Sequence, residues 1–323
     1  MTTEPKLRWG IMGCARISRR GLIPGIQGSA RGTLAALASR NRATARAWAS
    51  ELGIPRALGS YQELLDDPDV QAVYIPLPNE LHKPWVIASA DAGKHVLCEK
   101  PLARDAGEAR EMVKHCRSRG VVLMEAFMWR HQPRTGALRK LVAEGAIGEL
   151  RLIRSSFSFP IEAGDWRLDR ARGGGALWDI GCYGLSTARL FAGAEPVAVQ
   201  AMARFGPTGV DLTLTAELAF PRGIIGQIDC SFEQPNRCTY ELVGTHGVIE
   251  VPDAYLPPAR PIARLRDLSA SRELAFEGGD QYASMVDVFD QAVCDGGRLP
   301  DPAEDGLAQM QGLDAIRSVA HLV

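Results

Sequence analysis

The first 126 residues alternate short, almost wholly apolar runs with longer segments in which apolar positions recur at helical spacing. The apolar runs predict strands at residues 7–12, 32–39, 70–75, 95–98 and 121–126. Strands that are apolar on both faces are typical of a parallel sheet covered by helices on both sides. The pattern therefore predicts an α/β protein in which residues 1–126 form a Rossmann domain with a doubly wound parallel sheet.

From residue 127 onward, polar and apolar residues alternate along longer segments. Such alternation is typical of strands with one buried face. It predicts strands at residues 149–159, 196–205, 210–220, 223–232 and 238–243. Helices are predicted at residues 133–144, 176–191, 280–295 and 302–322. We expect a second, α+β domain over residues 127–323 with a large open, mainly antiparallel sheet, and C-terminal helices that are able to pack back on the first domain.

The size of this sheet also bears on assembly. An apolar face that covers many strands is rarely left in contact with water. We therefore expect a homodimer or homotetramer that forms through the C-terminal sheet.

Length and composition fit an ordinary soluble protein of two domains, with 323 residues, of which 46% are apolar and 23% charged. The seven cysteines show no metal-ligand spacing, which predicts free thiols, a reducing compartment and no bound metal. The polar residues 1–6 lack the apolar core of a secretion signal, and no apolar run approaches the roughly 18 residues of a membrane span. We expect a cytoplasmic protein without membrane contact.

The charge is unevenly distributed along the chain. Residues 5–50 hold nine of the 37 basic residues and no acidic residue, which leaves a net charge of −10 over the remainder. A basic module in an acidic protein indicates a local anionic ligand. The segment lacks interleaved aromatic residues and has a strand–helix–strand pattern, so a phosphorylated small molecule is favoured over nucleic acid.

An altered dinucleotide fingerprint follows the first predicted strand. Gly10 and Gly13 are retained, whereas Ala15 and Ser18 replace the second and third glycines of G-x-G-x-x-G. Alanine still lets the backbone approach a pyrophosphate that rests on the amides of a helix N-terminus. A simple strand–helix turn is the alternative. The expected cofactor contacts here are Gly10, Gly13, Cys14, Ala15, Arg16 and Ile17.

The end of the second predicted strand indicates which dinucleotide is bound. An NAD site places an acid there to hold the ribose 2′-hydroxyl, but this sequence has Ser39 and Arg40 instead. A guanidinium group pairs with a 2′-phosphate that an acid would repel. The sequence therefore predicts NADP rather than NAD, with Ser39 and Arg40 as contacts. The alternative is that Arg40 and Arg42 only keep the next helix soluble.

Two further strand ends carry candidate residues at the edge where open α/β sheets bind ligands. One is followed by Pro76, Leu77 and Asn79, with His82 opening the next helix, and these four are expected cofactor contacts. The other is followed by Glu99, Lys100 and Pro101. Taken alone, Lys100 fits a surface lysine before a turn proline, and His82 fits a packing residue.

In the second half, three glycines at residues 173–175 precede the predicted helix that carries Asp179 and Tyr183. Triple glycine lets a loop lie close to a ligand or to a neighbouring backbone. Gly181 and Gly184 weaken the helix by about 1 kcal/mol each relative to alanine, which indicates close packing against a flat surface. The alternative is a tight packing contact with an ordinary Asp–Tyr surface pair.

These motifs, in this order, resemble the glucose–fructose oxidoreductase/inositol dehydrogenase (Gfo/Idh/MocA) family over nearly the whole chain. Tyr183 in place of histidine resembles the branch with NADP-dependent D-xylose dehydrogenase and dimeric dihydrodiol dehydrogenase. The resemblance implies that Lys100 and Tyr183 flank the substrate hydroxyl and that the Lys100–Pro101 bond is cis. Residues of the E-A-F-M-W-R-H and D-W-R stretches are the expected substrate contacts. They are Trp129, Arg130, His131, Asp165 and Arg167.

The resemblance and the residue types together predict hydride transfer between nicotinamide C4 and a hydroxyl or carbonyl carbon of a sugar or polyol. Tyr183 is the expected general acid/base; a free tyrosine has a pKa of about 10, which an adjacent Lys100 ammonium would lower. Asp179 would orient Lys100 or a substrate hydroxyl, and Glu99 would hold backbone or ribose. The alternatives are a trans-dihydrodiol dehydrogenase, a keto-sugar reductase, and a catalytically silent NADP-binding sensor.

Overall fold

The computed structural model describes residues 6–322, so part of the polar N-terminal stretch, residues 1–5, lies outside the described residues. The chain divides into two compact units. The first comprises residues 1–131 and 280–307, and the second comprises residues 132–279 and 308–323. The first unit thus includes a segment that follows most of the second unit in the sequence. The two-domain boundary expected at residue 126 stays a prediction.

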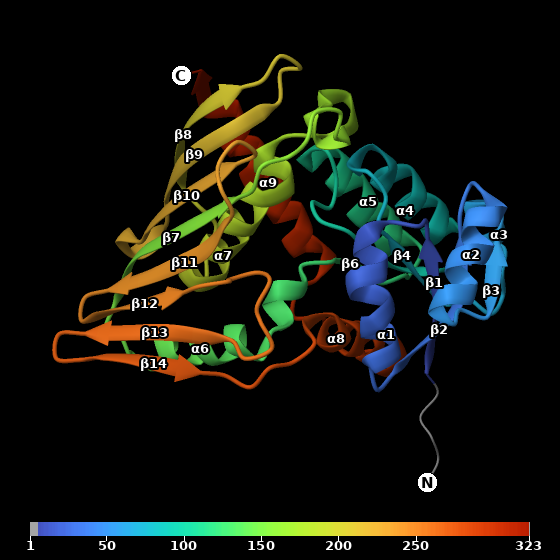
Figure 1. The fold of residues 1–323 in the computed structure, drawn as a ribbon, viewed down its shortest axis with the longest axis horizontal. Helices are drawn as coiled ribbons and strands as arrows, with labels where there is room; N and C mark the ends of the chain where they lie inside the picture. The colour runs from blue at the N-terminus through green and yellow to red at the C-terminus, as the bar shows by residue number, and fades with distance from the viewer. Residues whose placement is uncertain (1–5, 323) are drawn as a thin grey trace, which may run out of the picture. The chain divides into compact units, whose positions relative to one another are not determined.

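The first unit contains the Rossmann sheet that the apolar runs predict (Figure 1). Its six strands are parallel and lie in the order β3-β2-β1-β4-β5-β6, which is the doubly wound order. The strands are β1 (Leu7–Met12), β2 (Gly32–Ala38), β3 (Arg56–Leu58), β4 (Ala72–Ile75), β5 (His95–Cys98) and β6 (Leu123–Glu125). The short edge strand β3, which has no continuous apolar run, is not expected from the sequence.

The first unit also contains helices, most of which connect these strands. They are a π-helical turn η1 (Ser18–Leu22), α1 (Ile23–Gly28), α2 (Arg42–Leu52), α3 (Tyr61–Leu65), η2 (Asn79–Leu81), α4 (His82–Asp91), α5 (Ala106–Ser118), η3 (Met128–His131) and α8 (Gln281–Asp295). Asp105 caps α5, because its carboxylate accepts a hydrogen bond of 2.8 Å from the amide of Glu108. Such caps satisfy amides that have no partner inside the helix.

Helix α8 packs against α1 within the first unit. Two glycines of η1 and α1, Gly21 and Gly25, lie so close to Tyr282 that an added Cβ would come within 2.6 Å of its side chain. Trp9, fully buried in β1, donates an indole hydrogen bond of 3.0 Å to Asp290 of α8. The core of this unit is therefore completed by residues from the late part of the chain.

The second unit contains one nine-stranded sheet in the order β14-β13-β12-β11-β7-β10-β9-β8-β15. Its pairs are antiparallel except β7–β10 and β8–β15, so the mainly antiparallel open sheet expected from the sequence is confirmed. The strands are β7 (Leu150–Ser158), β8 (Ala198–Phe205), β9 (Asp211–Ala219), β10 (Ile225–Ser231), β11 (Arg237–Gly244), β12 (Gly247–Val251), β13 (Ile262–Asp267), β14 (Ser271–Ala275) and β15 (Ala320–Leu322).

The longer helices of this unit lie on one face of the sheet, and short helical turns connect its elements (Figure 1). They are α6 (Pro133–Ala143), short turns η4 (Trp166–Leu168) and η5 (Arg170–Arg172), a π-helical turn η6 (Leu177–Gly181), α7 (Cys182–Ala192), the turn η7 (Pro221–Gly223) and residues 308–319 of α9 (Ala303–Val319). Helix α7 packs on β7 and β10. The prediction that the last helix runs to residue 322 is wrong, because it ends at Val319 and residues 320–322 join the sheet.

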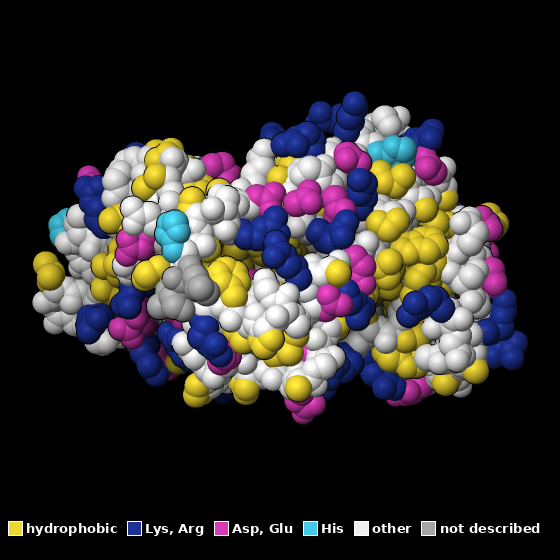
Figure 2. All heavy atoms as spheres, turned by 90° about the horizontal axis from the view of Figure 1, so that it is seen from above, with side chains coloured by type: hydrophobic (Ala, Val, Ile, Leu, Met, Phe, Trp, Pro, Cys, Tyr) yellow, Lys and Arg dark blue, Asp and Glu magenta, His cyan; other side chains and the backbone are white. Residues whose placement is uncertain are grey.

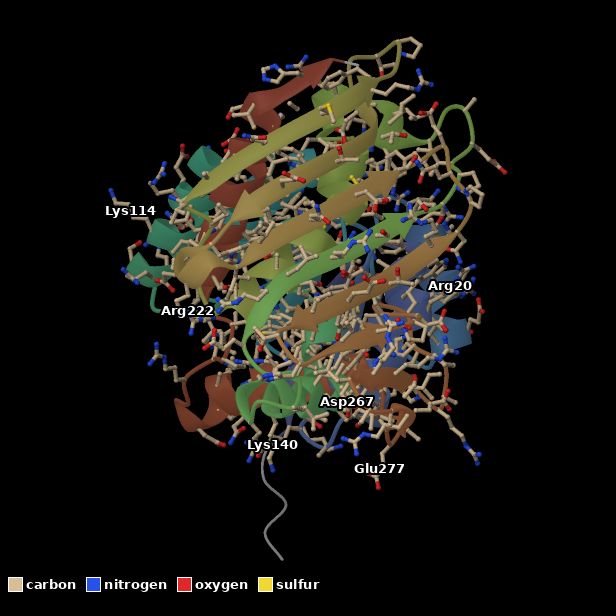
Figure 3. The ribbon with its side chains drawn as sticks, turned by 90° about the vertical axis from the view of Figure 1, so that its left-hand side faces the viewer. Arg20, Lys114, Lys140, Arg222, Asp267 and Glu277 are labelled. Atoms are coloured by element: carbon tan, nitrogen blue, oxygen red, sulfur yellow. The ribbon has the colours of Figure 1, made fainter. Side chains whose placement is uncertain are left out.

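The opposite face of this sheet is polar, and Figure 3 looks onto it. Its side chains include ion pairs between neighbouring strands, such as Arg154 with Glu241 at 3.2 Å and Arg237 with Asp229 at 2.7 Å. A shallow hollow of about 910 Å³ lies among them. The expectation that the sheet leaves a large apolar face for a partner chain to cover is therefore wrong. Helices of the same chain cover the apolar side.

Acidic residues from other parts of the chain pair with some of the basic residues at positions 5–50. Arg31 pairs with Asp295 and Arg42 with Glu63, each at 2.7 Å, so acids from later in the chain offset part of that charge. Figure 2 shows Lys and Arg side chains beside Asp and Glu side chains on the face that it presents. Among the described residues, no helix is long and apolar enough to cross a membrane.

Candidate active site

The turn after β1 leaves room for a backbone approach to a ligand. Gly13 has φ +105°, and its amide donates a hydrogen bond of 2.8 Å to the carbonyl of Ala38. A Cβ at this glycine would lie 3.0 Å from Leu77 and 3.3 Å from the hydroxyl of Tyr61. Only glycine fits this conformation without strain. Gly10 is buried within β1, while Cys14 to Ile17 form the turn and the first helical residues after it.

Four side chains gather near this turn, where a dinucleotide would place its adenosine end. Ser39 follows β2 and hydrogen-bonds with the Cys14 thiol, whose pKa is raised by burial. Arg40 is exposed and donates a hydrogen bond to the Tyr61 hydroxyl. Burial raises the pKa of Tyr61, which keeps the phenol neutral. Tyr61 is a candidate that sequence reasoning missed, because only the fold brings α3 beside the end of β2.

Arg42 has a different environment from Arg40. Its guanidinium donates hydrogen bonds of 2.8 and 2.7 Å to the two carboxylate oxygens of Glu63. The backbone amide of Gly59 holds the same carboxylate at 3.1 Å. The contacts of Arg42 therefore favour a structural role, which separates it from Arg40.

The loop after β4 is tied to the turn after β5 by His82. Its Nδ1 lies 3.0 Å from the carbonyl of Pro101, and its Nε2 lies 2.7 Å from the carbonyl of Leu77. The side chain is fully buried, and burial lowers its pKa, while the two carbonyl groups oppose that shift. These contacts favour a structural role for His82. Pro76 and Asn79 of the same loop are buried as well.

The Glu99–Lys100–Pro101 stretch lies directly after β5, and the Lys100–Pro101 bond is cis, as the family resemblance implies. The Tyr74 hydroxyl donates a hydrogen bond of 2.5 Å to the Glu99 carboxylate. Burial and the Glu99 charge raise the pKa of Tyr74 well above its usual value, so Tyr74 remains the donor. The hydrogen bond from Tyr74 thus holds the Glu99 side chain in place at the start of the turn that carries Lys100.

Three expected substrate contacts lie at the end of the first sheet, in η3. Trp129 is fully buried. The Arg130 guanidinium forms ion pairs of 2.7 Å with Asp301 and 2.6 Å with Asp305. Burial lowers the pKa of His131 to about 4. These surroundings favour a packing role for the three residues, and their contact with substrate stays a prediction.

In the second unit, the expected residues Asp165, Arg167 and Asp179 form one cluster. Arg167 donates a hydrogen bond of 2.7 Å from Nε to Asp179 and contacts Asp165 at 3.3 Å. Both carboxylates outweigh the effect of burial and raise the pKa of Arg167. Asp179 is therefore oriented by an arginine of its own unit, a partner that spacing alone does not reveal.

Tyr183 lies in a buried aromatic cluster one helical turn beyond Asp179. Its ring centroid is 5.4 Å from that of Phe157 and 4.7 Å from that of Tyr255. Such contacts fix the plane of a ring. Tyr255 is fixed in turn by hydrogen bonds with Ser155 at 2.7 Å and Thr187 at 2.9 Å.

Gly181 and Gly184 bring the helix close to the sheet. A Cβ at Gly184 would lie 3.0 Å from Ile228, and one at Gly181 would lie 2.9 Å from Cys230. The expectation of close packing against a flat surface is confirmed, because both contacts are with β10 of the sheet. The described residues contain no group of three or more His, Cys, Asp or Glu that could hold a metal ion.

The turn at Gly13, the doubly wound sheet and the residues at its carboxyl edge fit a bound dinucleotide, and they define an NAD(P)-binding oxidoreductase. Residues 7–127 match the oxidoreductase family with an NAD-binding Rossmann fold, and residues 135–250 match the GFO/IDH/MocA C-terminal domain. The chain belongs to the Gfo/Idh/MocA family.

Relatives resemble the chain over most of its length. It is 39% identical to a D-xylose 1-dehydrogenase (NADP(+)) of Haloferax volcanii, with 96% of each chain covered. It is 36% identical to a trans-1,2-dihydrobenzene-1,2-diol dehydrogenase of Bos taurus over 80% of this chain and 78% of the relative. These matches confirm the branch that Tyr183 indicates.

A solved relative is the 3-ketoreductase of Actinomadura kijaniata in complex with TDP-benzene and NADP. It superposes with a TM-score of 0.91 at 33% identity, covering 98% of this chain and 99% of its own. Structures of that enzyme also include a tyrosine-to-phenylalanine mutant and mutants in which a lysine is changed to alanine or glutamate.

Proposed function

We propose that this protein uses NADP to transfer hydride to or from a hydroxyl-bearing carbon of a sugar or polyol. The observation that carries the proposal is the nucleotide turn, where Gly13 at positive φ leaves room for a pyrophosphate and Arg40 follows β2 in place of an acid. NADP in a complex of the ketoreductase and in the name of the Haloferax relative supports the same dinucleotide.

The cofactor would supply or accept the hydride, and the chain's own residues would handle the proton. Oxidation of a carbinol releases a proton from the substrate oxygen, and reduction of a carbonyl requires one. Tyr183 is the proposed acid/base, and a lysine ammonium such as Lys100 favours the phenolate and donates to the substrate oxygen. A lysine and a tyrosine are the residues altered in the ketoreductase structures, which supports this pair.

The remaining site residues would position these two groups. Glu99, held by Tyr74, would fix the turn that carries Lys100 or bind ribose. Asp179 would orient a substrate hydroxyl, with Arg167 holding its carboxylate. His82 would keep the loop with Leu77 and the turn with Pro101 at a fixed spacing.

A second candidate is the reduction of a keto group on a nucleotide-linked sugar. The relative bound to TDP-benzene favours it, as does the loop at residues 165–172, where Trp166 contacts the guanidinium groups of Arg167 and Arg172 at 5.1 and 5.7 Å. An indole ring and a basic side chain suit a base and a phosphate. The trans-dihydrodiol dehydrogenase activity of the Bos taurus relative is the further alternative.

Absorbance at 340 nm would separate these candidates. The purified protein is mixed with NADP⁺ and a panel of aldoses, polyols and trans-diols, and with NADPH and a panel of keto sugars and dTDP-linked keto sugars. Turnover of an aldose or polyol is the expected result. Turnover of only diols or only nucleotide sugars would select an alternative, and no turnover in either direction would favour the silent sensor.

The acid/base role is tested by Tyr183→Phe. We expect kcat to fall by about 100-fold or more, since general acid–base groups contribute roughly 10²–10⁴-fold. Tyr240→Phe is the matched control, because it removes a buried tyrosine hydroxyl of the same unit and should keep wild-type kcat. Wild-type kcat in Tyr183→Phe would remove Tyr183 from the mechanism.

We also propose that the protein forms a homodimer or homotetramer through the open face of the nine-stranded sheet. Its polar ion pairs and exposed Met202 suit a wet interface rather than an apolar one. Light scattering after gel filtration should give two or four times the chain mass. Thr215→Arg, on this face, should shift that mass toward the monomer, whereas Asp267→Lys at the β13–β14 turn should not. A monomeric wild type would contradict the proposal.

A further inference from the structure

A buried carboxyl group lies beneath the first turn of the helix that carries Asp179 and Tyr183. Asp211 opens β9 and is 8% exposed. Its Oδ2 accepts a hydrogen bond of 2.6 Å from the amide of Leu177, and the amide of Ala176 donates to the same carboxyl. The contact joins residues 34 apart in the sequence, so it fastens the start of the helix to the sheet.

The contact takes the place of an ordinary helix cap. Ala176, at the start of η6, provides no side-chain cap. The first amides of a helix lack partners within it, and a negative group beside them is stabilising. Asp211 therefore provides, from a strand distant in the sequence, the N-cap acceptor that a serine or aspartate next to the helix usually provides. The contact fixes where the helix begins.

The triple glycine makes room for this arrangement. Gly175 has φ +126°, and a Cβ there would lie 2.3 Å from Oδ1 of Asp211. A Cβ at Gly174 would lie 2.2 Å from the carbonyl of Arg167. The Gly175 amide donates a hydrogen bond of 2.9 Å to that same carbonyl. The glycines thus let the carboxyl and the loop of Arg167 both approach the start of the helix.

The anchor lies within one helical turn of Asp179 and about two turns before Tyr183. The amide of Asp179 donates a hydrogen bond of 3.1 Å to the carbonyl of Gly175, and Arg167 holds the Asp179 carboxylate at 2.7 Å. Beyond Tyr183, Gly184 lets the helix lie flat on the sheet. A shift of the helix start would therefore be transmitted directly to Asp179 and Tyr183.

We propose that Asp211, locked in place by Gly175, is a positioning residue that holds Asp179 and Tyr183 in register for proton transfer. The inference rests on the proposed role of Tyr183. Misplacement of a reacting group by about 1 Å can reduce a rate by roughly 100-fold. Loss of the Asp211 contact should therefore reduce kcat. It should not change cofactor binding, because the proposed cofactor site lies in the first unit.

The ionisation of Asp211 gives the proposal a pH signature. Burial raises the pKa of Asp211 to about 7, against the amides of Leu177 and Ala176 and the charge of Arg317. The buried thiol of Cys230 on β10 also faces this carboxyl group. An ionised carboxyl accepts both amides more strongly than a neutral one. The positioning effect should therefore strengthen as pH rises through about 7.

The experiment compares Asp211→Asn, Gly175→Ala and Gly164→Ala, with Asp211→Ala as a further variant. Gly164 is the matched control, because it also has a positive φ, +87°, but nothing lies within 4 Å of an added Cβ. For each variant, kcat and KM are measured from pH 5.5 to 9, the Kd for NADPH is measured by fluorescence, and Tm is recorded at pH 8.

We expect Asp211→Asn to lower kcat by about 10-fold and to remove the rise in kcat that the wild type should show as pH increases through about 7. Asp211→Ala and Gly175→Ala should lower kcat by up to about 100-fold. The Kd for NADPH should stay within about 2-fold of wild type, as for Gly164→Ala. The Tm of Asp211→Asn at pH 8 should equal or exceed that of wild type, since a buried charge is removed. A purely stabilising role would instead lower Tm and leave kcat unchanged.

Wild-type kcat and an unchanged pH profile in Asp211→Asn would overturn the inference, even if Gly175→Ala fails to fold. If kcat of Asp211→Asn still rises as pH increases through about 7, that rise does not come from Asp211, and the assignment is overturned. If the wild type turns over no substrate, the proposed function itself fails, and if Tyr183→Phe retains full activity, the proposed role of Tyr183 fails. An inactive Tyr183→Phe beside a fully active Asp211→Asn would reject this inference alone.

Discussion

At the scale of single residues, the most informative comparison is between two arginines that the sequence presents as near equals. Arg40 and Arg42 both follow β2, but Arg42 is held by both oxygens of Glu63, and Arg40 contacts the neutral hydroxyl of Tyr61. A guanidinium group beside a neutral partner keeps its charge available for an anionic ligand. The cofactor preference should therefore depend on Arg40 and not on Arg42.

Replacement of Arg40 by alanine should raise the KM for NADP⁺ by about 10- to 100-fold and leave the KM for NAD⁺ within about 3-fold. The reason is that hydrogen bonds to charged groups are worth roughly 1.5–3 kcal/mol, and a 2′-phosphate would lose them. Steady-state kinetics with both cofactors provides the measurement. Arg42→Ala is the control and should change neither KM. Equal losses with both cofactors would count against a 2′-phosphate contact at Arg40.

At the scale of helices and strands, hydrophobic periodicity predicted most of what positions the site. The apolar runs that end at Met12 and Cys98 correctly placed the strands that lead into Gly13 and Lys100. The helix of Tyr183 was expected at residues 176–191 and runs from Leu177 to Ala192, with its first turn π-helical. The local pattern succeeds here because the side chains that share one face of a helix or strand recur at a fixed period along the sequence.

The partners of the site residues could not be predicted in the same way. Tyr61 beside Arg40, Arg167 beside Asp179 and Asp211 beneath Leu177 are all contacts between separate elements. No periodicity encodes which loop meets which helix. The polar open face of the second sheet was also misjudged, because alternation shows that a strand has two faces but does not show which one the helices cover.

His82 illustrates how one element fixes the spacing of two others, and it gives a prediction at this scale. His82→Phe would remove the ring N–H, which in the neutral imidazole donates to one of the buried carbonyl groups of Leu77 and Pro101, at a cost of about 1–3 kcal/mol. We expect a lower Tm, together with a fall of about 10-fold in kcat. Thermal melting and kinetics at pH 7.5 provide the measurement.

His115→Phe is the control for His82, because His115 forms a partly exposed pair with Asp91 at the surface of the first unit. A surface pair of this kind contributes roughly 0–1 kcal/mol, so His115→Phe should change Tm by less than about 4 °C and should leave kcat unchanged. If His82→Phe lowers Tm but keeps full kcat, then the spacing of the two loops does not matter for catalysis.

At the scale of the whole molecule, the first unit is completed by a segment that lies more than 250 residues beyond its first strand. Asp290 of α8 accepts a hydrogen bond from Trp9 of β1 and is fully buried. Its Oδ2 has no hydrogen-bond partner among the described residues. Burial and the nearby Asp287 raise the pKa of Asp290 to about 7, against the charge of Arg31. The stability of the contact between β1 and α8 therefore depends on pH.

The sign of this dependence follows from the proton balance. The carboxyl has an ordinary pKa of 3.8, so between about pH 4 and 7 the folded chain keeps a proton that the unfolded chain has lost. The contribution of Asp290 to the free energy of unfolding therefore falls as pH rises through this window. Asp290→Asn keeps an oxygen for the indole of Trp9 and removes the buried charge. We expect it to raise stability at pH 8 by roughly 1–3 kcal/mol, or about 2–10 °C in Tm, and by much less at pH 5.

Thermal melting of Asp290→Asn and wild type at pH 5, 6.5 and 8 tests this expectation. Asp295→Asn is the matched control on the same helix, since Asp295 is partly exposed and pairs with Arg31 at 2.7 Å. The difference between Asp290→Asn and wild type should widen steadily with pH, whereas that of Asp295→Asn should stay nearly constant. A gain in Tm that is the same at all three pH values would mean that Asp290 does not titrate in this range. A loss of Tm at pH 8 would mean that the ionised carboxylate itself stabilises the joint between α8 and β1.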